Sequence, residues 1–268
     1  QADSKFGFDL NNGQADEAFT QVKDHPYLNL LGLHCHIGSQ IFETDGFALA
    51  AGKVMNKMGA WKQSHGFECS VLNLGGGFGI RYTEEDKPLE PHVYVEEMIK
   101  SVQEEAEAVK LAMPEIWIEP GRSLVGDAGT SLYTVGSQKT VPGVRQYIAV
   151  DGGMSDNIRP ALYDAKYEAI IANKANQAKD ATYTVAGKLC ESGDKLIIDA
   201  ALQKAESGDI LAMFCTGAYG YSMASNYNRV PRPAVVFVEA GEHQLAIRRE
   251  SYDDIVVNDL PLTLKKGE

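Results

Sequence analysis

Three short stretches in the first half of the chain bring together side chains that bind anions or transfer protons. They are HCHIGSQ at residues 34–40, GGGFG at residues 75–79 and EPGRS at residues 119–123. The hydroxyl of Ser39, glycine amides without a neighbouring Cβ and the guanidinium of Arg122 are groups that suit a phosphate. The imidazole of His36 and the carboxylate of Glu119 can contact a charged aromatic ring. The combination favours an aromatic cofactor that carries a phosphate.

A metal site and ordinary packing are the alternatives for these stretches. Two histidines and a cysteine in HCH could begin a metal site, but zinc requires further ligands, and no other histidine or cysteine lies at a recognisable spacing. GGGFG alone could be a tight turn, since it lacks the G-x-G-x-x-G spacing of a dinucleotide-binding fold. EPGRS could be a surface loop with an ion pair. The sequence thus predicts no metal, and a binding site requires that the three stretches meet.

The elements around these stretches predict such a meeting. Each stretch ends an apolar run that reads as a strand, within residues 28–39, 70–79 and 115–123, at about the 40-residue spacing of β/α units. Residues 47–64 and 93–112 between them have the apolar spacing of amphipathic helices. Strands joined in this way are parallel, and their carboxyl ends share one edge of the sheet.

After about residue 124 the sequence changes to runs rich in Val, Thr and Tyr that are typical of β-structure. We expect strands within RQYIAVDGG (145–153), ATYTVAGKL (181–189) and DILAMFCTG (209–217), a hairpin at VEAGEHQLAI (238–247), and a short helix within GAYGYSMASNYN (217–228). The predicted fold class is therefore α/β plus all-β. Residues 1–124 would be the last three units of a (β/α)8 barrel, and residues 125–268 a mainly β C-terminal domain.

Three β/α units cannot close a barrel, which needs eight. We therefore expect the sequence to be the latter part of a longer protein, with KFGFDL (5–10) as the end of an earlier strand in which Phe6 and Phe8 alternate with polar residues. The net charge of -12 disfavours nucleic acid and anionic membranes as partners. Four scattered cysteines without a C-x-x-C pair suggest neither a zinc ribbon nor a disulfide framework, which fits a reducing cytoplasm.

Six stretches, in this order along the chain, carry a resemblance to a known family. They are HCHIGSQ, GGGFG, EPGRS, DGGMSDNIRPALY, CESGD and GAYG. Together they closely resemble the pyridoxal-phosphate decarboxylases built on an alanine-racemase-like barrel, in particular those that act on diaminopimelate. The resemblance covers essentially the whole chain. It implies pyridoxal 5'-phosphate as cofactor and decarboxylation of meso-diaminopimelate to L-lysine, the last step of lysine biosynthesis.

The resemblance also implies roles for residues at the cofactor. His36 would stack on the pyridine ring, with His34 as its packed neighbour. Glu119 would pair with the pyridine nitrogen, which makes the ring an electron sink, and Tyr219 would close over the cofactor. The phosphate would be held by Ser39, Gly75, Gly76, Gly77, Gly121 and Arg122.

Substrate binding is implied for a second set of residues. Cys190 would reach the partner's active site in a homodimer and donate a proton, although composition alone favours a buried structural thiol. Glu191 would contact the distal ammonium of the substrate. The distal carboxylate of the substrate would be bound by Arg122, Arg159 and Tyr163, with Tyr219 beside it. The sequence CE, where ornithine decarboxylases carry an aspartate, favours diaminopimelate over ornithine, lysine or carboxynorspermidine.

One departure from the family concerns the lysine that binds the cofactor covalently. IANKANQ (171–177) resembles the family's lysine motif, but Lys174 follows every barrel motif, so we expect a solvated surface lysine there. The covalent lysine would lie in an N-terminal part outside this sequence, and these 268 residues alone would be inactive. The alternatives are another basic amino-acid or polyamine-pathway decarboxylase, or a non-catalytic binding protein derived from a decarboxylase.

Overall fold

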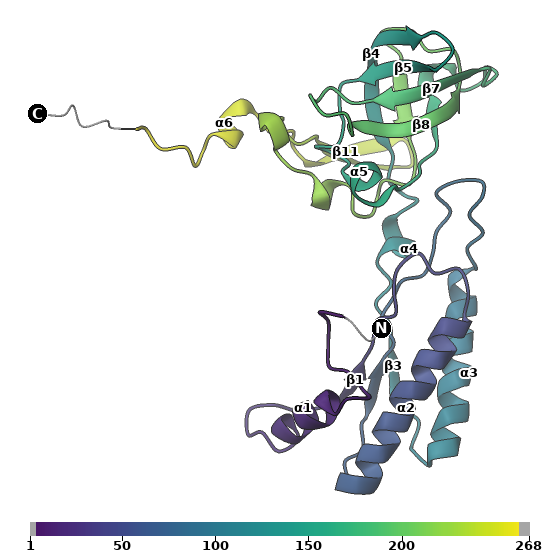
Figure 1. The fold of residues 1–268 in the computed structure, drawn as a ribbon, viewed down its shortest axis with the longest axis vertical. Helices are drawn as coiled ribbons and strands as arrows, with labels where there is room; N and C mark the ends of the chain where they lie inside the picture. Colours follow the sequence, from purple (N-terminus) through teal and green to yellow (C-terminus); the bar gives the residue numbers. More distant parts are fainter. Residues whose placement is uncertain (1–3, 263–268) are drawn as a thin grey trace, which may run out of the picture. The chain divides into compact units, whose positions relative to one another are not determined.

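The computed structural model describes residues 4–262, which form two compact units (Figure 1). Within the described range, the first unit consists of residues 4–80 and 87–124, and the second of residues 81–86 and 125–262. The short segment 81–86 thus packs with the second unit although it lies within the first in sequence, which no pattern in the sequence indicated.

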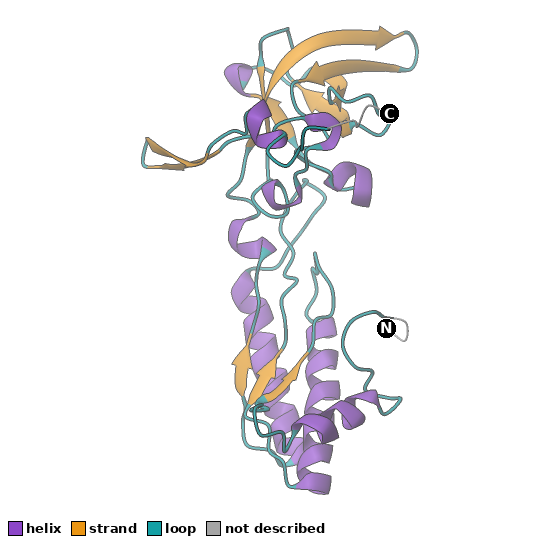
Figure 2. Ribbon diagram, turned by 90° about the vertical axis from the view of Figure 1, so that its left-hand side faces the viewer, coloured by secondary structure: helices purple, strands orange, loops and turns teal. Residues whose placement is uncertain are grey.

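A small parallel sheet organises the first unit. Its strands are β1 (Gly32–His34), β2 (Val71–Asn73) and β3 (Glu115–Trp117), in the order β1-β2-β3. All pairs are parallel and in register, so that His34 faces Asn73 and Asn73 faces Trp117. The predicted strands and their direction are confirmed. Their carboxyl ends lie at one edge of the sheet (Figure 2).

The two long helices follow the sequence prediction closely. They are α2 (Asp45–His65) and α3 (Pro91–Val109), and α1 (Gln14–Val22) precedes β1. Proline at the first position of α3 fits a helix start, since its missing N–H needs no partner there. Gly66 ends α2 in the left-handed conformation at φ 67°, and its N–H donates to the carbonyl of Lys62.

The core of the first unit lies between the sheet and the helices α1, α2 and α3. Phe19 of α1 stacks on Trp61 of α2 at 4.2 Å between ring centroids, and Phe78 stacks on Tyr94 of α3 at 4.9 Å. The hydroxyl of Tyr94 donates to the carbonyl of Ile41 at 2.8 Å, which satisfies its polar atom inside the core. The remaining buried members of the core are Ala15, Phe47, Ala51, Val54, Met55, Met58, Cys69, Leu72, Leu74, Met98, Val102 and Ala106.

The predicted strand at residues 5–10 is wrong for the described chain. Residues 5–10 form bends, and Phe6 and Phe8 are 76% and 67% exposed. No neighbouring strand of the described residues pairs with this segment, so the alternation of phenylalanines with polar residues has no sheet face to bury.

The second unit is built on a six-stranded sheet in the order β6-β9-β4-β5-β7-β8. Its strands are β4 (Ser131–Val141), β5 (Arg145–Val150), β6 (Ala169–Ile171), β7 (Ala181–Ala186), β8 (Lys195–Leu202) and β9 (Ile210–Met213). All neighbours are antiparallel except β5 and β7, which are parallel. The two outer strands approach each other, since Ile171 of β6 donates its N–H to Gln203, just after β8, at 2.9 Å. The sheet is therefore barrel-like.

The expected hairpin at residues 238–247 is confirmed, and the expected short helix within residues 217–228 is present in the 3₁₀ form. The hairpin pairs β10 (Val235–Glu239) with β11 (Glu242–Ile247). Residues 217–228 contain a 3₁₀ turn, η2 (Tyr221–Met223), and the start of a second, η3 (Tyr227–Arg229), in place of an α-helix. Asn228 adopts φ 52°, which interrupts any regular helix there.

Short helical elements complete the chain. They are α4 (Arg122–Val125), α5 (Arg159–Tyr163), η1 (Ala172–Lys174) and α6 (Tyr252–Ile255). Among residues 4–262, no helix is both long and apolar enough to cross a membrane.

Candidate active site

The loops that follow β1, β2 and β3 are in direct contact, because the glycines between them allow it. A Cβ on Gly76 would lie 2.0 Å from the carbonyl oxygen of Glu119, and a Cβ on Gly77 would lie 2.2 Å from that of Gly38. Real side chains do not tolerate such distances, so glycine is required at both positions. The three stretches singled out in the sequence therefore lie together at one end of the sheet.

The amides of this glycine loop are partly used within the protein. The N–H of Gly75 donates to Oδ1 of Asn73 at 2.9 Å, and the N–H of Gly76 donates to Nδ1 of His36 at 3.3 Å. The amides of Gly75 and Gly76 thus already have acceptors within the protein. Binding of an anion at this end of the sheet would therefore depend chiefly on side chains from the neighbouring loops.

Arg122 and Ser39 supply such side chains. Nη2 of Arg122 donates to Oγ of Ser39 at 3.0 Å, which joins the loop after β3 to the loop after β1. Arg122 is 9% exposed, whereas Ser39 is exposed. The pair presents a hydroxyl beside a positive charge, which is a suitable environment for a phosphate.

The carboxylate of Glu119 lies between two polar side chains. Oε2 is 3.4 Å from Nε2 of His34, and Oε1 accepts a hydrogen bond from Nδ2 of Asn73 at 2.8 Å. The side chains of His34 and Glu119 remain 51% and 54% exposed. Glu119 is thus held at the strand ends, yet it stays accessible to a ligand.

The expectation that His34 is only a packed neighbour of His36 is wrong. β1 ends at His34, so His36 lies in the loop that follows the strand. His34 is exposed beside Glu119, and His36 is exposed with its Nδ1 on the amide of Gly76. Both imidazoles therefore lie at the end of the sheet where the loops meet.

In the second unit, Arg159 is buried between two tyrosines. Arg159 is 8% exposed. Its Nη1 donates to the hydroxyl of Tyr82 at 3.2 Å and to the hydroxyl of Tyr167. Its guanidinium carbon lies 5.1 Å from the ring centroid of Tyr82 and 5.6 Å from that of Tyr167. Burial raises the pKa of Tyr167. Arg159 is thus firmly positioned, whereas Tyr163, at the other end of α5, is 61% exposed.

Cys190 and Glu191 lie on an exposed loop between β7 and β8. The hydroxyl of Tyr227 donates to Oε1 of Glu191, and this hydrogen bond raises the pKa of Tyr227. Burial raises the pKa of the thiols of Cys35 and Cys69 to about 11, and Cys69 is 3% exposed. Cys190 is exposed, so it is not the buried structural thiol that composition alone favours.

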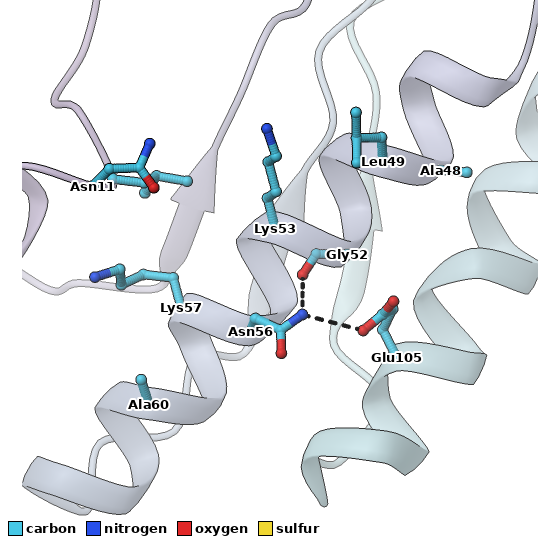
Figure 3. Close-up of a pocket in the computed structure, with 10 residues that line it drawn as sticks. Asn11, Ala48, Leu49, Gly52, Lys53, Asn56, Lys57, Ala60 and Glu105 are labelled. Atoms are coloured by element: carbon cyan, nitrogen blue, oxygen red, sulfur yellow. Dashed lines mark hydrogen bonds between the residues drawn. The ribbon is translucent and has the colours of Figure 1, made fainter. Parts of the chain in front are cut away.

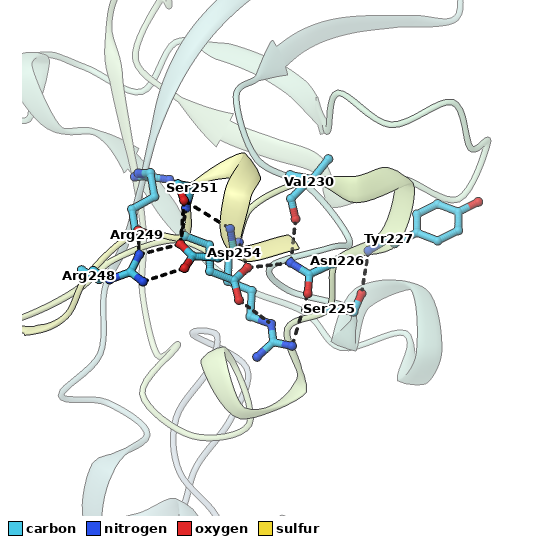
Figure 4. A network of polar contacts seen from close by, with 10 residues as sticks. Ser225, Asn226, Tyr227, Val230, Arg248, Arg249, Ser251 and Asp254 are labelled. Atoms are coloured by element: carbon cyan, nitrogen blue, oxygen red, sulfur yellow. Dashed lines mark hydrogen bonds and ion pairs between the residues drawn. The ribbon is translucent and has the colours of Figure 1, made fainter. Parts of the chain in front are cut away.

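A polar network fixes the segment that carries Tyr227 (Figure 4). Asn226 donates through Nδ2 to Oε2 of Glu250 at 2.6 Å and to the carbonyl of Val230 at 3.1 Å. Close by, Arg248 pairs with Asp254, whose carboxylate also caps α6 by accepting from Ser251. Tyr227 therefore reaches Glu191 from a well-anchored turn.

Tyr219 occupies a strained position in GAYG. It adopts φ 58°, in the left-handed region that non-glycine residues rarely enter, and it is 45% exposed. A Cβ on Gly217 would lie 1.8 Å from the carbonyl oxygen of Val125, so the glycine before it is required for close packing. Strained backbone of this kind is concentrated at functional sites.

The prediction that Lys174 is a solvated surface residue is wrong. Its side chain is only 15% exposed, and Nζ lies 2.7 Å from Oδ2 of buried Asp209 and 3.2 Å from Oε2 of Glu206. The hydrogen bond that Lys174 donates to Asp209 is the main reason that the pKa of Lys174 is raised. Lys174 is therefore held as a charged partner of two carboxylates.

A groove of about 740 Å³ runs along α2 and contains none of the expected site residues (Figure 3). Asn56 lies in it and donates to the carbonyl of Gly52 and to Oε2 of Glu105. The described residues contain no group of three or more His, Cys, Asp or Glu side chains that could hold a metal.

Comparison with known proteins assigns the family. Residues 1–126 match the pyridoxal-binding domain of pyridoxal-dependent decarboxylases. The chain belongs to the pyridoxal-dependent decarboxylase family. Among curated members of the family, diaminopimelate decarboxylase of Bacillus subtilis is 65% identical over 97% of the chain and 60% of that protein, and the enzyme of Halalkalibacterium halodurans is 60% identical over 99% of the chain and 60% of that protein.

Solved structures of the family agree. The chain resembles diaminopimelate decarboxylase from M. jannaschii in complex with L-lysine, with a TM-score of 0.90, 37% identity, and coverage of 97% of the chain and 58% of that structure. Diaminopimelate decarboxylase from Helicobacter pylori complexed with L-lysine matches with a TM-score of 0.80, 30% identity, and coverage of 91% and 58%. The chain thus spans about three-fifths of the length of the decarboxylases that it matches.

Sequence reasoning missed three polar residues that organise these loops. Asn73 bonds both Glu119 and Gly75, Tyr227 bonds Glu191, and Asp194 is buried beneath the loop of Cys190. The sequence could have indicated Asn73, since a polar residue that ends an apolar strand close to three glycines needs a hydrogen-bond partner at the end of the sheet. Tyr227 lies 36 residues from Glu191, and no local pattern relates the two.

Proposed function

We propose that the protein to which this chain belongs decarboxylates meso-diaminopimelate to L-lysine with pyridoxal 5'-phosphate as cofactor. The observation that carries the proposal is the 65% identity with a diaminopimelate decarboxylase, which extends over 97% of the chain and so includes both units. We further propose that residues 1–124 are part of a pyridoxal-phosphate-binding (β/α) barrel, and residues 125–268 a mainly β C-terminal domain.

The geometry of the first unit supports a phosphate-bearing pyridine at the strand ends. Ser39 and Arg122 would hold the phosphate together with the backbone of Gly75, Gly76, Gly77 and Gly121. His36 would lie against the ring. Glu119, fixed by His34 and Asn73, would pair with the ring nitrogen, for which its exposed carboxylate is suitable.

When bound, the cofactor would supply an electron sink for the bond that loses CO2. Glu119 would stabilise the proton on the ring nitrogen through a charge-assisted hydrogen bond. Cys190 would return a proton to the carbon that has lost CO2, as an exposed thiol on a loop can do.

Recognition of the substrate would depend on the second unit. Arg159 offers a fixed guanidinium for a carboxylate, and Arg122, Tyr163 and Tyr219 would add donors. Glu191 would accept from the distal ammonium, with Tyr227 orienting its carboxylate. A substrate with an amino-acid group at each end needs both kinds of partner, which favours diaminopimelate over lysine or ornithine.

We also propose a homodimer in which Cys190 and Glu191 complete the partner's site. Such shared sites require a stable symmetric interface, typically above about 2,000 Å². Sedimentation of the full-length protein tests this, because fully active monomers would contradict it.

A decarboxylation assay of the full-length protein with meso-diaminopimelate, lysine, ornithine and arginine tests the function. We expect CO2 release and L-lysine formation with diaminopimelate only. A preference for ornithine or lysine would assign the protein to another branch of the family. Binding of pyridoxal phosphate without turnover of any of the four would indicate a binding protein instead.

A further inference from the structure

Asp194, the last residue of CESGD, is a buried carboxylate that joins two loops of the second unit. It is 3% exposed. Oδ2 accepts from the N–H of Leu189 at 2.8 Å, and Oδ1 accepts from the N–H of Met154 at 2.7 Å. Leu189 directly precedes Cys190, so the carboxylate fixes the backbone at the start of the segment that carries Cys190 and Glu191.

The backbone of Asp194 closes the same loop from the other side. Its N–H donates to the carbonyl of Glu191 at 3.1 Å, and its carbonyl accepts from the N–H of Gly187 at 2.9 Å. Cys190 and Glu191 thus lie between two sets of hydrogen bonds from one residue. Both are exposed, so little packing holds them, and their position depends on these hydrogen bonds together with the one that Tyr227 donates to Glu191.

Two glycines leave room for the carboxylate. A Cβ on Gly187 would lie 2.2 Å from Oδ2 of Asp194, and a Cβ on Gly153 would lie 2.5 Å from Oδ1. The N–H of Lys188 also donates to the carbonyl of Gly152 at 3.0 Å, which ties the two loops together beside Asp194. The local sequences DGGM and GKLCESGD therefore fit around one side chain.

An ionised carboxylate is the group that this arrangement requires. Each of its oxygens accepts from a different backbone amide, and an asparagine could accept only one of them, because its other terminal atom is an NH2 donor. In Asp194→Asn, the side chain keeps its shape, but its NH2 group faces the N–H of either Leu189 or Met154, so that two donors meet and one hydrogen bond is lost.

We propose that Asp194 is a positioning residue that fixes the Cys190–Glu191 loop and so sets the preference for a substrate with a distal ammonium. This inference rests on the proposed function for its consequence in catalysis, and on the hydrogen bonds above for the anchoring itself. Asp194 acts through Glu191 and Cys190.

Amide hydrogen exchange of the full-length protein tests the anchoring. In the wild type, the amides of Leu189 and Met154 should be the slowest to exchange in their loops. In Asp194→Asn their exchange should accelerate at least about tenfold, because a hydrogen bond to a charged acceptor is lost. Asp209→Asn is a matched control: Asp209 is 6% exposed in the same unit and accepts from Glu206 and Asn173, so its loss should leave both amides unchanged.

Kinetics test the consequence. The ratio of kcat/KM for diaminopimelate to that for 2-aminopimelate, which lacks the distal ammonium, should fall about tenfold or more in Asp194→Asn and stay constant in Asp209→Asn. General destabilisation would lower both values equally. If Asp194→Asn does not fold, Gly187→Ala, which displaces the carboxylate with its charge retained, should give the same loss of preference.

The outcomes separate the two proposals. Unchanged exchange of Leu189 and Met154, or an unchanged preference in a folded variant, would overturn the role of Asp194 even in an active enzyme. A wild-type protein that releases no CO2 from diaminopimelate would overturn the proposed function and the specificity role together, while the exchange data would still report whether Asp194 anchors the loop.

Discussion

Arg122 and Ser39, which are 83 residues apart in sequence, are joined by a hydrogen bond of 3.0 Å from Nη2 to Oγ. The bond connects the loop after β3 with the loop after β1, across the end of the sheet. It orients a nearly buried guanidinium toward an exposed hydroxyl. The two residues thus form a ready-made pair of donors for an anion.

Ser39→Ala should raise the Kd for pyridoxal phosphate in the full-length protein about tenfold, because one neutral or charge-assisted hydrogen bond is lost. Absorbance or fluorescence titration measures this. Ser64→Ala is the matched control, since Ser64 is an exposed serine of α2 that bonds only the carbonyl of Ala60. Equal affinity in wild type and Ser39→Ala would remove Ser39 from the phosphate site.

Arg159→Ala should weaken diaminopimelate by roughly 2 to 4 kcal/mol while pyridoxal phosphate binds as before, because a substrate carboxylate loses a charge-assisted partner. Arg159→Lys should recover part of this, since it keeps the charge but loses the planar group between Tyr82 and Tyr167. Steady-state KM values and cofactor titrations are the measurements. Arg145→Ala, at an exposed ion pair with Asp199, is the control.

Loss of cofactor and substrate affinity by equal factors in Arg159→Ala would mean that Arg159 serves the fold. The ratio of substrate affinity to cofactor affinity, and not a melting curve, separates a role in substrate binding from a role in the fold. The hydroxyls of Tyr82 and Tyr167 both accept from Arg159, so some loss of thermal stability is expected in either case.

Asp16 should make the stability of the first unit depend on pH. The hydrogen bond from Trp61 and that from Lys57 lower the pKa of Asp16 below its ordinary value of 3.8. A group whose pKa is lower in the folded state stabilises the fold above the unfolded pKa, and this contribution is lost as the pH falls through the folded pKa. The stabilisation is therefore present at neutral pH and disappears below about pH 4.

Melting temperatures of wild type and Asp16→Asn measure this contribution. The wild type should melt on the order of 1–2 °C higher at pH 7, a small difference because the carboxylate is half exposed. The difference should shrink as the pH falls below about 4 and vanish once Asp16 is protonated in the folded state as well. Glu17→Gln, on the exposed side of α1, should match the wild type at every pH. A constant difference across the range would contradict the pKa argument.

Gly76→Ala should destabilise the protein by about 3 kcal/mol, because its Cβ would lie 2.0 Å from the carbonyl oxygen of Glu119 and the backbone must move. Denaturant unfolding measures this. Gly136→Ala is the control, since its Cβ would lie at an ordinary 3.6 Å from the carbonyl of Ala149. Comparable stability of the two variants would show that the glycine loop can relax.

Local patterns predicted the elements of this chain well, and the contacts between distant residues poorly. The helices α2 and α3 and the three parallel strands follow from apolar spacing and from glycine and proline at their ends, which are local properties. The strand expected at Phe6 and Phe8 failed because alternation predicts a strand only where a neighbour pairs with it. Such a neighbour cannot be read from six residues.

In the candidate site, too, local patterns predicted the positions of residues better than the contacts between distant residues. His36, Glu119 and Arg122 lie at strand ends, where parallel topology must gather them, so their meeting was predictable. The contact of His34 with Glu119 was not, because β1 ends earlier than its apolar run. Lys174 was misjudged because its partner Asp209 lies 35 residues further along, and no local signal marks a buried carboxylate.

Cys190→Ala should lower turnover of diaminopimelate by about 100-fold or more, because a positioned proton donor contributes on this scale. The absorbance of the bound cofactor should be unchanged, since Cys190 is not among the residues assigned to the ring and the phosphate. Cys215→Ser is the matched control: this thiol is half-buried and contacts the carbonyl of Arg81, outside the assigned site. The same turnover and the same product in Cys190→Ala would leave Cys190 without a role in proton transfer, and would direct the search for the donor to Tyr219.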